Sequence, residues 1–213
     1  MESNAAACRY GIEPETAALV SIDFQVGFTD GSLAVVPDAA VALRNFIRAA
    51  NYWRSRRGLV YHVRTYFTPD RGPAGGIPAL APDFDSVSNA LAEDSPKAAF
   101  CAGLVRPEDI LVRKTTFSAT IGSDLIDQLR SRGIESVVIG GLTTPICVQT
   151  TVDGLSMSGF RVMVLEDSCA SQPIGSFNAA QAHRAAIERM GYLFAHISNS
   201  SDFIGGSTAV ADA

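Results

Sequence analysis

Residues 137–151 have the sequence VVIGGLTTPICVQTT, a short apolar run that passes through two glycines into a segment with helical character. Such a run is typical of a parallel strand that is buried on both faces. We predict Thr144 as the helix N-cap and Pro145 as the first helical residue, which places Cys147 in the first turn. The positive end of the helix dipole favours the reactive thiolate there. Cys147 is therefore a candidate nucleophile, although most free cysteines are inert buried side chains.

Similar apolar runs occur on both sides of this segment, and stretches with helical spacing separate them. The expected strands are residues 17–22, 59–63, 110–112, 137–139, 162–165 and 192–195. Repeated strand and helix units cross over with the right hand, which gives an open parallel sheet with helices on both faces. The predicted fold is a doubly wound parallel sheet in a three-layer α/β/α sandwich.

The domain organisation follows from length and composition. A chain of 213 residues with 47% hydrophobic side chains forms one domain, residues 1–213, which buries roughly 70% of its unfolded surface without metal or disulfide cross-links. We expect residues 1–14 to be a flexible N-terminal extension. Residues 68–107 are rich in Pro, Gly, Asp and Ser, so they are expected to form a loop excursion over the sheet edge.

The charge balance excludes two classes of partner. The formal net charge is -5, whereas nucleic acids and anionic membranes require clustered Lys and Arg. A small-molecule substrate is the expected partner. The cysteines, Cys8, Cys101, Cys147 and Cys169, show no paired spacing, which indicates a reducing compartment. No signal peptide or membrane-spanning run is visible, so we expect a cytoplasmic protein; unconventional secretion would leave no sequence signature.

Polar residues follow several of the predicted strands, at the edge where ligands bind in open parallel sheets. Asp23 ends the first strand, Arg64 follows the second, Lys114 follows the third, and the Cys147 turn follows the fourth. Asp23 could accept the thiol proton and Lys114 could keep that carboxylate ionised. Taken singly, however, a strand-end aspartate often caps a turn, and a lysine after a strand is usually solvated. The three histidines, His62, His183 and His196, form no obvious constellation with Cys147.

Three stretches carry a resemblance to a known family. They are LVSIDFQVGF at 19–28, VRKTTFSAT at 112–120, and residues 137–170, which contain the pattern G-x-x-T-x-x-C-V-x-x-T. In order and spacing they resemble the isochorismatase-like cysteine hydrolases, which include nicotinamidases, N-carbamoylsarcosine amidases, ureidoacrylate and biuret hydrolases, and isochorismatases. The resemblance covers most of the chain and is most specific around Cys147.

The resemblance implies a catalytic triad of Asp23, Lys114 and Cys147. It also implies a cis peptide between Leu142 and Thr143, and an oxyanion hole formed by the backbone N–H groups of Thr143 and Cys147. Members of the family are commonly dimers or tetramers, so a homo-oligomer is expected.

The segment after the second strand departs from one branch of the family. Metal-dependent nicotinamidases carry an Asp-x-His-x-His cluster there, whereas residues 62–70 are HVRTYFTPD. We therefore expect no metal and no other cofactor, and nicotinamide is disfavoured as substrate. Arg64 in the same segment could bind a substrate carboxylate, although a surface arginine is an equally good interpretation. The other candidate substrate-binding residues are the polar Gln25 and Thr144 and the aromatic Phe28, Tyr66 and Phe117, any of which could belong to the core.

Three hypotheses for the function remain open from the sequence. The first is hydrolysis of a small amide or carbamoyl (ureido) compound through a thioester on Cys147. The second is hydrolysis of the vinyl ether isochorismate to 2,3-dihydro-2,3-dihydroxybenzoate and pyruvate, with Asp23 as general acid. The third is a non-catalytic, flavodoxin-like binding module in which Gly140 and Gly141 cradle phosphate.

Overall fold

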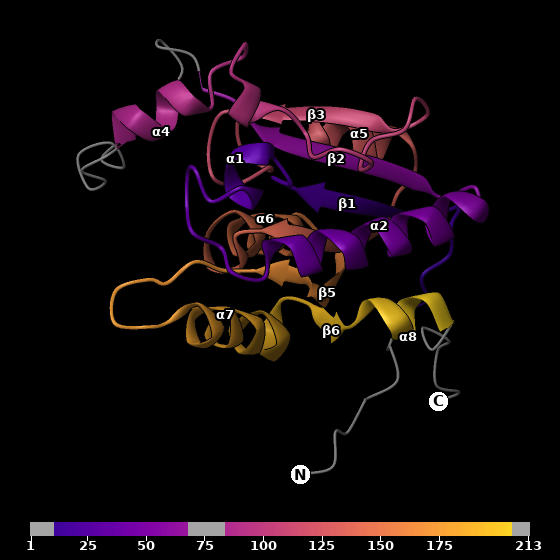
Figure 1. Ribbon diagram of the computed structural model, residues 1–213. Helices are drawn as coiled ribbons and strands as arrows, with labels where there is room; N and C mark the ends of the chain where they lie inside the picture. Colours follow the sequence, from indigo (N-terminus) through magenta and orange to yellow (C-terminus); the bar gives the residue numbers. More distant parts are fainter. Residues whose placement is uncertain (1–10, 68–83, 206–213) are drawn as a thin grey trace.

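The computed structural model describes residues 11–67 and 84–205, whose six strands form one parallel sheet with the order β3-β2-β1-β4-β5-β6 (Figure 1). The strands are β1 (Ala17–Ile22), β2 (Leu59–Thr65), β3 (Ile110–Lys114), β4 (Ser136–Leu142), β5 (Arg161–Ala170) and β6 (His196–Ser198). The strand order reverses between β1 and β4, and in such sheets the carboxyl ends beside this switch point form the ligand-binding crevice.

Helices cover both faces of the sheet, so the predicted three-layer arrangement is confirmed. Figure 1 shows α2 (Ala39–Ser55) in front of the sheet, and α5 (Leu125–Ser131) and α6 (Gln149–Met157) behind it. α8 (Ser200–Gly205) packs beside α2, whereas α7 (Ala179–Leu193) joins the α5 and α6 side. Two separate apolar cores result, one on each face of the sheet.

Alternation along β1 explains why two cores form. Ala18, Val20 and Ile22 enter the core beneath α5, α6 and α7, while Ala17 and Leu19 enter the core beneath α2. Successive side chains of a strand point to opposite faces, so a strand that is apolar at nearly every position is buried on both. The nearly continuous apolar run in the sequence, interrupted by Ser21, is thereby explained.

The last predicted strand is wrong in its position. Residues 192–195 were expected to be extended, but α7 continues to Leu193 and β6 begins at His196. Tyr192 and Leu193 are 89% and 73% exposed, whereas Met190 is buried, which is the pattern of a helix surface. A short apolar run does not by itself distinguish a strand from the end of a helix.

Parts of the two segments predicted to be irregular are packed or helical where the structure describes them. Ile12 is buried against the α2 core, and residues 1–10 of the predicted extension lie outside the described part. Residues 68–107 include α4 (Phe84–Ala90) and the 3-10 helix η1 (Pro96–Ala98), and 68–83 lie outside the described residues. Across residues 11–67 and 84–205, no helix has the length and apolar character needed to cross a bilayer.

Candidate active site

Asp23 leaves β1 in an unusual backbone conformation. Its φ of 52° lies in the left-handed region, which aspartate tolerates better than most residues. The carboxylate is fully buried and faces the end of β2, where Oδ1 accepts the backbone N–H of Thr65 at 2.8 Å and Oδ2 accepts the Thr65 hydroxyl at 3.0 Å. A buried carboxylate at the end of a strand is thus held by two donors from a single neighbouring residue.

Lys114 ends β3 and connects the other polar groups. Its Nζ lies 2.8 Å from Asp23 Oδ2, 2.5 Å from Thr65 Oγ1, 3.0 Å from the Thr116 carbonyl oxygen and 3.4 Å from Cys147 Sγ. Burial of the ammonium lowers its pKa, but the charge of Asp23 and the contact with Cys147 outweigh burial, so the pKa of Lys114 is raised. Lys114 is therefore a buried cation that touches both Asp23 and Cys147, and we refer to these three residues as the rim cluster.

Cys147 lies in η2 (Thr144–Val148), a single π-helical turn that precedes α6. The N-cap is Thr143 rather than the predicted Thr144, and its carbonyl oxygen accepts the N–H groups of Ile146 and Val148. The thiol is only 6% exposed. Desolvation raises the pKa of Cys147 to about 12; Lys114 opposes that rise and Asp23 adds to it. Burial therefore favours the thiol form of Cys147, in the direction opposite to the thiolate that its helical position predicts.

The segment before Cys147 has the cis peptide bond that the resemblance implies. The Leu142–Thr143 peptide bond is cis. Within the described part of the chain, no group accepts a hydrogen bond from the backbone N–H of Thr143. Gly141 has a φ of 152°, and a Cβ at this position would lie 2.3 Å from the Ile22 carbonyl oxygen. Glycine is thus required where β4 passes against the end of β1.

Two of the residues predicted to bind substrate are already engaged with other protein groups. Gln25 is buried: its Oε1 accepts the Thr65 N–H at 2.9 Å, and its Nε2 donates to the carbonyl oxygens of Thr65 and Ala98 at 3.0 and 2.9 Å. Gln25 therefore braces the chain behind Asp23. Thr144 is also buried, with Oγ1 2.9 Å from His183 Nδ1, and this bond ties η2 to α7.

Arg64 is not brought to the rim cluster. It precedes Thr65 on β2, so its side chain takes the opposite face of the sheet, and its guanidinium carbon lies 5.6 Å from the centre of the Phe100 ring. Tyr66 lies on the same side as Arg64 and donates its hydroxyl to Glu93. Both residues thus belong to a charged surface group at the β2 and β3 end of the sheet.

The remaining aromatic candidates lie on different sides of the site. Phe117 is half-buried and packs against the core that contains Cys147. Phe28 of α1 (Val26–Thr29) is half-buried and packs against the small cluster of Phe67, Leu91 and Ala98 as well as the α2 core. Of the aromatic residues proposed as pocket walls, Phe117 is the one that shares a core cluster with the thiol.

Thr65 is the functional candidate that the sequence analysis missed. It donates to Asp23 through both its backbone and its hydroxyl, and it contacts Lys114. Its signal in the sequence is its position, since it is the residue after Arg64 at the carboxyl end of the second strand. In the described part of the chain, no group of three or more His, Cys, Asp or Glu side chains is arranged to hold a metal ion.

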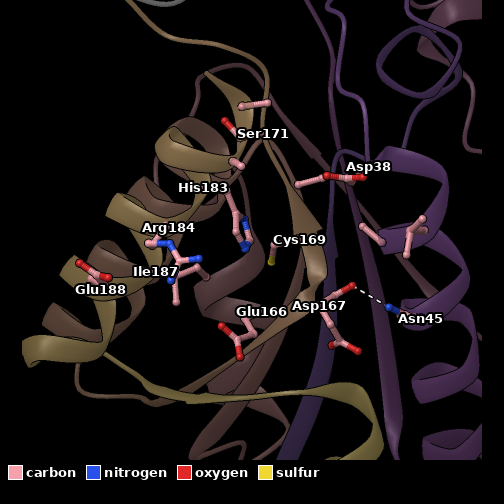
Figure 2. Close-up of a pocket in the computed structure, with 15 residues that line it drawn as sticks. Asp38, Asn45, Glu166, Asp167, Cys169, Ser171, His183, Arg184, Ile187 and Glu188 are labelled. Atoms are coloured by element: carbon pink, nitrogen blue, oxygen red, sulfur yellow. Dashed lines mark hydrogen bonds between the residues drawn. The ribbon is translucent and has the colours of Figure 1, made fainter. Parts of the chain in front are cut away.

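A separate pocket of about 450 Å³ lies at the carboxyl end of β5 (Figure 2). Figure 2 shows Asn45 of α2 and the N-cap residue Asp38 on one side, His183 and Arg184 of α7 on the other, and Cys169 of β5 between them. None of the rim cluster lines it. The pocket is connected to the η2 turn through α7, by the hydrogen bond between His183 and Thr144 and by the packing of Ile187 in the core that contains Cys147.

The sequence matches a known family over most of its length. The family model of the isochorismatase domain matches residues 17–202. The chain therefore belongs to the isochorismatase family, and it is a hydrolase.

Relatives and solved structures agree with this assignment. Maleamate amidohydrolase from Pseudomonas putida is 28% identical over 154 residues, which is 70% of this chain and 70% of that protein. Ureidoacrylate amidohydrolase from Variovorax paradoxus is 35% identical over 100 residues, which is 46% of this chain and 37% of that protein. The crystal structure of a cysteine hydrolase from Pseudomonas syringae pv. phaseolicola has the same fold, with a TM-score of 0.82 at 23% identity over 99% of this chain and 100% of that chain.

Proposed function

We propose that this protein hydrolyses a small amide or carbamoyl (ureido) compound through a thioester on Cys147. The observation that carries the proposal is the position of Lys114 Nζ, 2.8 Å from Asp23 Oδ2 and 3.4 Å from Cys147 Sγ. A base, a cation and a nucleophile thus share one buried cluster at the carboxyl ends of the strands. Two relatives named for amide hydrolysis, of maleamate and of ureidoacrylate, support the choice of bond.

The first half of the reaction forms the thioester. Because the pKa of Cys147 is raised to about 12, the nucleophile starts as a thiol, and its proton passes to the Asp23 carboxylate as Sγ bonds to the substrate carbonyl carbon. The carbonyl electron pair moves onto oxygen, and the N–H groups of Thr143 and Cys147 donate to that oxyanion. When the C–N bond breaks, Asp23 returns its proton to the departing nitrogen.

The second half regenerates the enzyme. A water molecule gives a proton to Asp23 as its oxygen attacks the thioester carbonyl, and the oxyanion forms again in the same place. The C–S bond then breaks, Cys147 recovers its proton from Asp23, and the acid product leaves. Lys114 keeps its charge throughout and thereby stabilises the carboxylate before each proton transfer and the sulfur during it.

A substrate panel tests this proposal. Maleamate, ureidoacrylate, N-carbamoylsarcosine and isochorismate are incubated with the wild-type protein and with Cys147→Ala. We expect amide turnover to fall by at least about 10⁴-fold in the variant, as for loss of other catalytic nucleophiles. Acid quenching followed by mass spectrometry of the intact wild-type protein is expected to show an acyl adduct. Digestion of the quenched protein should place this adduct on the peptide that contains Cys147.

Cys169→Ala is the matched control. Cys169 is also buried and its pKa is likewise raised to about 12, but within the described part of the chain it forms no hydrogen bond or ion pair with Lys114 or Asp23. Its variant is expected to retain activity within a few-fold. Full amide turnover by Cys147→Ala would reject the thioester route, and turnover of isochorismate alone by that variant would assign vinyl ether hydrolysis, with Asp23 as general acid.

A further inference from the structure

Thr65 contacts both charged members of the rim cluster. Its hydroxyl lies 2.5 Å from Lys114 Nζ and 3.0 Å from Asp23 Oδ2, and the residue is buried. An ammonium group can only donate hydrogen bonds, and a carboxylate can only accept them. The direction of these two hydrogen bonds is therefore fixed: Lys114 donates to the Thr65 oxygen, and the single hydroxyl proton of Thr65 points at Asp23.

The backbone of Thr65 is held just as firmly. Its N–H donates to Asp23 Oδ1 at 2.8 Å and also to Gln25 Oε1 at 2.9 Å, while its carbonyl oxygen accepts Gln25 Nε2 at 3.0 Å. The Gln25 amide thus brackets Thr65 from both sides, as a neighbouring strand would. The hydrogen bonds with Gln25 consequently fix the position of Thr65, and Thr65 in turn holds the Asp23 carboxylate.

The two oxygens of that carboxylate differ in the donors that they receive. Oδ2 accepts from the Thr65 hydroxyl and from Lys114, whereas Oδ1 accepts from the Thr65 N–H among the described residues. A carboxylate oxygen has about two lone-pair sites. Both sites on Oδ2 are thus filled, so Oδ1 keeps one site for a further donor such as the Cys147 thiol, which hydrogen-bonds to Asp23.

We propose that Thr65 is a positioning residue that fills Oδ2 of Asp23 and thereby makes Oδ1 the atom that takes the proton of Cys147. This inference rests on the proposed amide hydrolysis, in which Asp23 takes and returns that proton. Thr65 does not touch the reacting atoms. It acts through Asp23 and Lys114, by fixing the rotation of one and the position of the other.

Thr65→Val tests the role because valine keeps the shape of threonine and lacks the hydroxyl. We expect kcat to fall about tenfold to a hundredfold, with KM nearly unchanged, since Thr65 lies behind Asp23. The acid limb of the kcat/KM profile is expected to move to higher pH, because the charged carboxylate loses one donor. The titratable groups that face this carboxylate are Lys114 from β3 and Cys147 from η2. Thr65→Ser keeps the hydroxyl, so it should restore both kcat and the pH of the acid limb to their wild-type values.

The matched control is Thr151→Val. Thr151 is equally buried, and its hydroxyl accepts one backbone N–H, that of Ala119, at 3.0 Å. This variant loses a buried hydrogen bond on α6 without touching the rim cluster, so its acid limb should coincide with that of the wild type. Wild-type kcat and an unmoved limb in Thr65→Val would overturn the inference. An equal fall in kcat in Thr65→Val and Thr65→Ser, with no movement of the acid limb, would also overturn the inference. That result would show that the role of Thr65 is purely structural.

A second measurement needs no substrate. The rate at which iodoacetamide alkylates Cys147 is followed against pH by mass spectrometry, because thiolate formation through Asp23 requires an ionised carboxylate. The acid limb of this alkylation profile should move to higher pH in Thr65→Val and should stay in place in Thr151→Val. If Cys147→Ala retained amide turnover, the proposed function would fall while the alkylation profile still decided the role of Thr65.

Discussion

Two buried hydrogen-bonded networks lie on opposite faces of the same strands. The rim cluster joins Asp23, Lys114 and Cys147 on the α5 and α6 side. On the α2 side, Ser21 Oγ lies 2.7 Å from His62 Nδ1, and His62 Nε2 lies 3.0 Å from Asp109 Oδ2. We refer to Ser21, His62 and Asp109 as the inner network, and it has the order of side chains found in serine hydrolases.

Position in the sheet, rather than the type of side chain, separates the two networks. Ser21, the next-to-last residue of β1, pairs directly with His62 in the middle of β2, and both are fully buried. Arg54 of α2 covers the far end, donating to Asp109 at 2.9 and 2.6 Å. Asp23 lies two residues further along, at the end of the strand. The inner network therefore joins β1 to β2 by buried hydrogen bonds, whereas the rim cluster lies at the carboxyl ends of the strands, where ligands bind in such sheets.

Exchanging the two aspartates for asparagine should separate the networks most clearly. Asp23→Asn removes the proton acceptor, and we expect amide turnover to fall by about 10³-fold or more. The thiol pKa of Cys147 should fall at the same time, because the charge of Asp23 contributes to raising it. Thiolate absorbance against pH measures this shift, so the variant would combine a more acidic thiol with a slower enzyme.

Asp109→Asn provides the comparison. Breaking its paired contacts with Arg54 and His62 should lower the free energy of unfolding by about 3 kcal/mol, while the folded variant keeps kcat within a few-fold. The free energy is measured by urea titration. A large loss of kcat in well-folded Asp109→Asn would contradict the separation between the two faces.

The inner network should also reveal itself in the pH dependence of stability. Burial lowers the pKa of His62 below its usual 6.5, and Asp109 only partly opposes this. The unfolded chain therefore binds the proton more readily, so the contribution of His62 is complete above about pH 6.5 and is lost as pH falls through the folded-state pKa. His62→Gln should cost about 2 kcal/mol near pH 8.

Denaturant titrations of both proteins between pH 8 and pH 5 measure this effect. The gap in unfolding free energy between wild type and His62→Gln should narrow on acidification. His183 and His196 also have pKa values lowered by burial and are common to both proteins. A gap that widened toward pH 5 would mean that His62 is protonated more readily in the folded protein than in the unfolded chain.

The smallest expected effect belongs to Ser21→Ala. The variant loses one buried hydrogen bond to His62 and should be less stable by about 1 kcal/mol, with unchanged kcat/KM. Thermal unfolding and a steady-state assay measure the two quantities. A tenfold fall in kcat/KM would show that the inner network supports the rim cluster across the sheet.

Much of this arrangement is predictable from the sequence because parallel strands impose simple rules. Apolar runs locate β1 to β5, and the rule that carboxyl ends meet at one edge predicts the convergence of Asp23, Lys114 and Cys147. The contact of Lys114 with both of the other residues confirms that convergence. The rule assigns residues to an edge and not to a face of the sheet.

The errors arise where three-dimensional burial or side-chain direction decides the outcome. Arg64 and Thr65 are equally good rim candidates in the sequence, and only the structure shows that Thr65 faces Asp23 while Arg64 lies over Phe100. The protonation of Cys147 depends on how completely its neighbours exclude water, which no local pattern contains. The boundary between α7 and β6 was missed because four apolar residues suit either element.

The left-handed backbone at Asp23 limits how this position can change over evolutionary time. Few residues other than glycine, asparagine and aspartate adopt a φ of 52° at low cost. An aspartate codon becomes an asparagine codon by one base change, and asparagine fits both the turn and the space. The easiest substitution that preserves the fold therefore removes the acidic group. Descendants of this gene that keep the fold but lose the chemistry should carry asparagine at position 23.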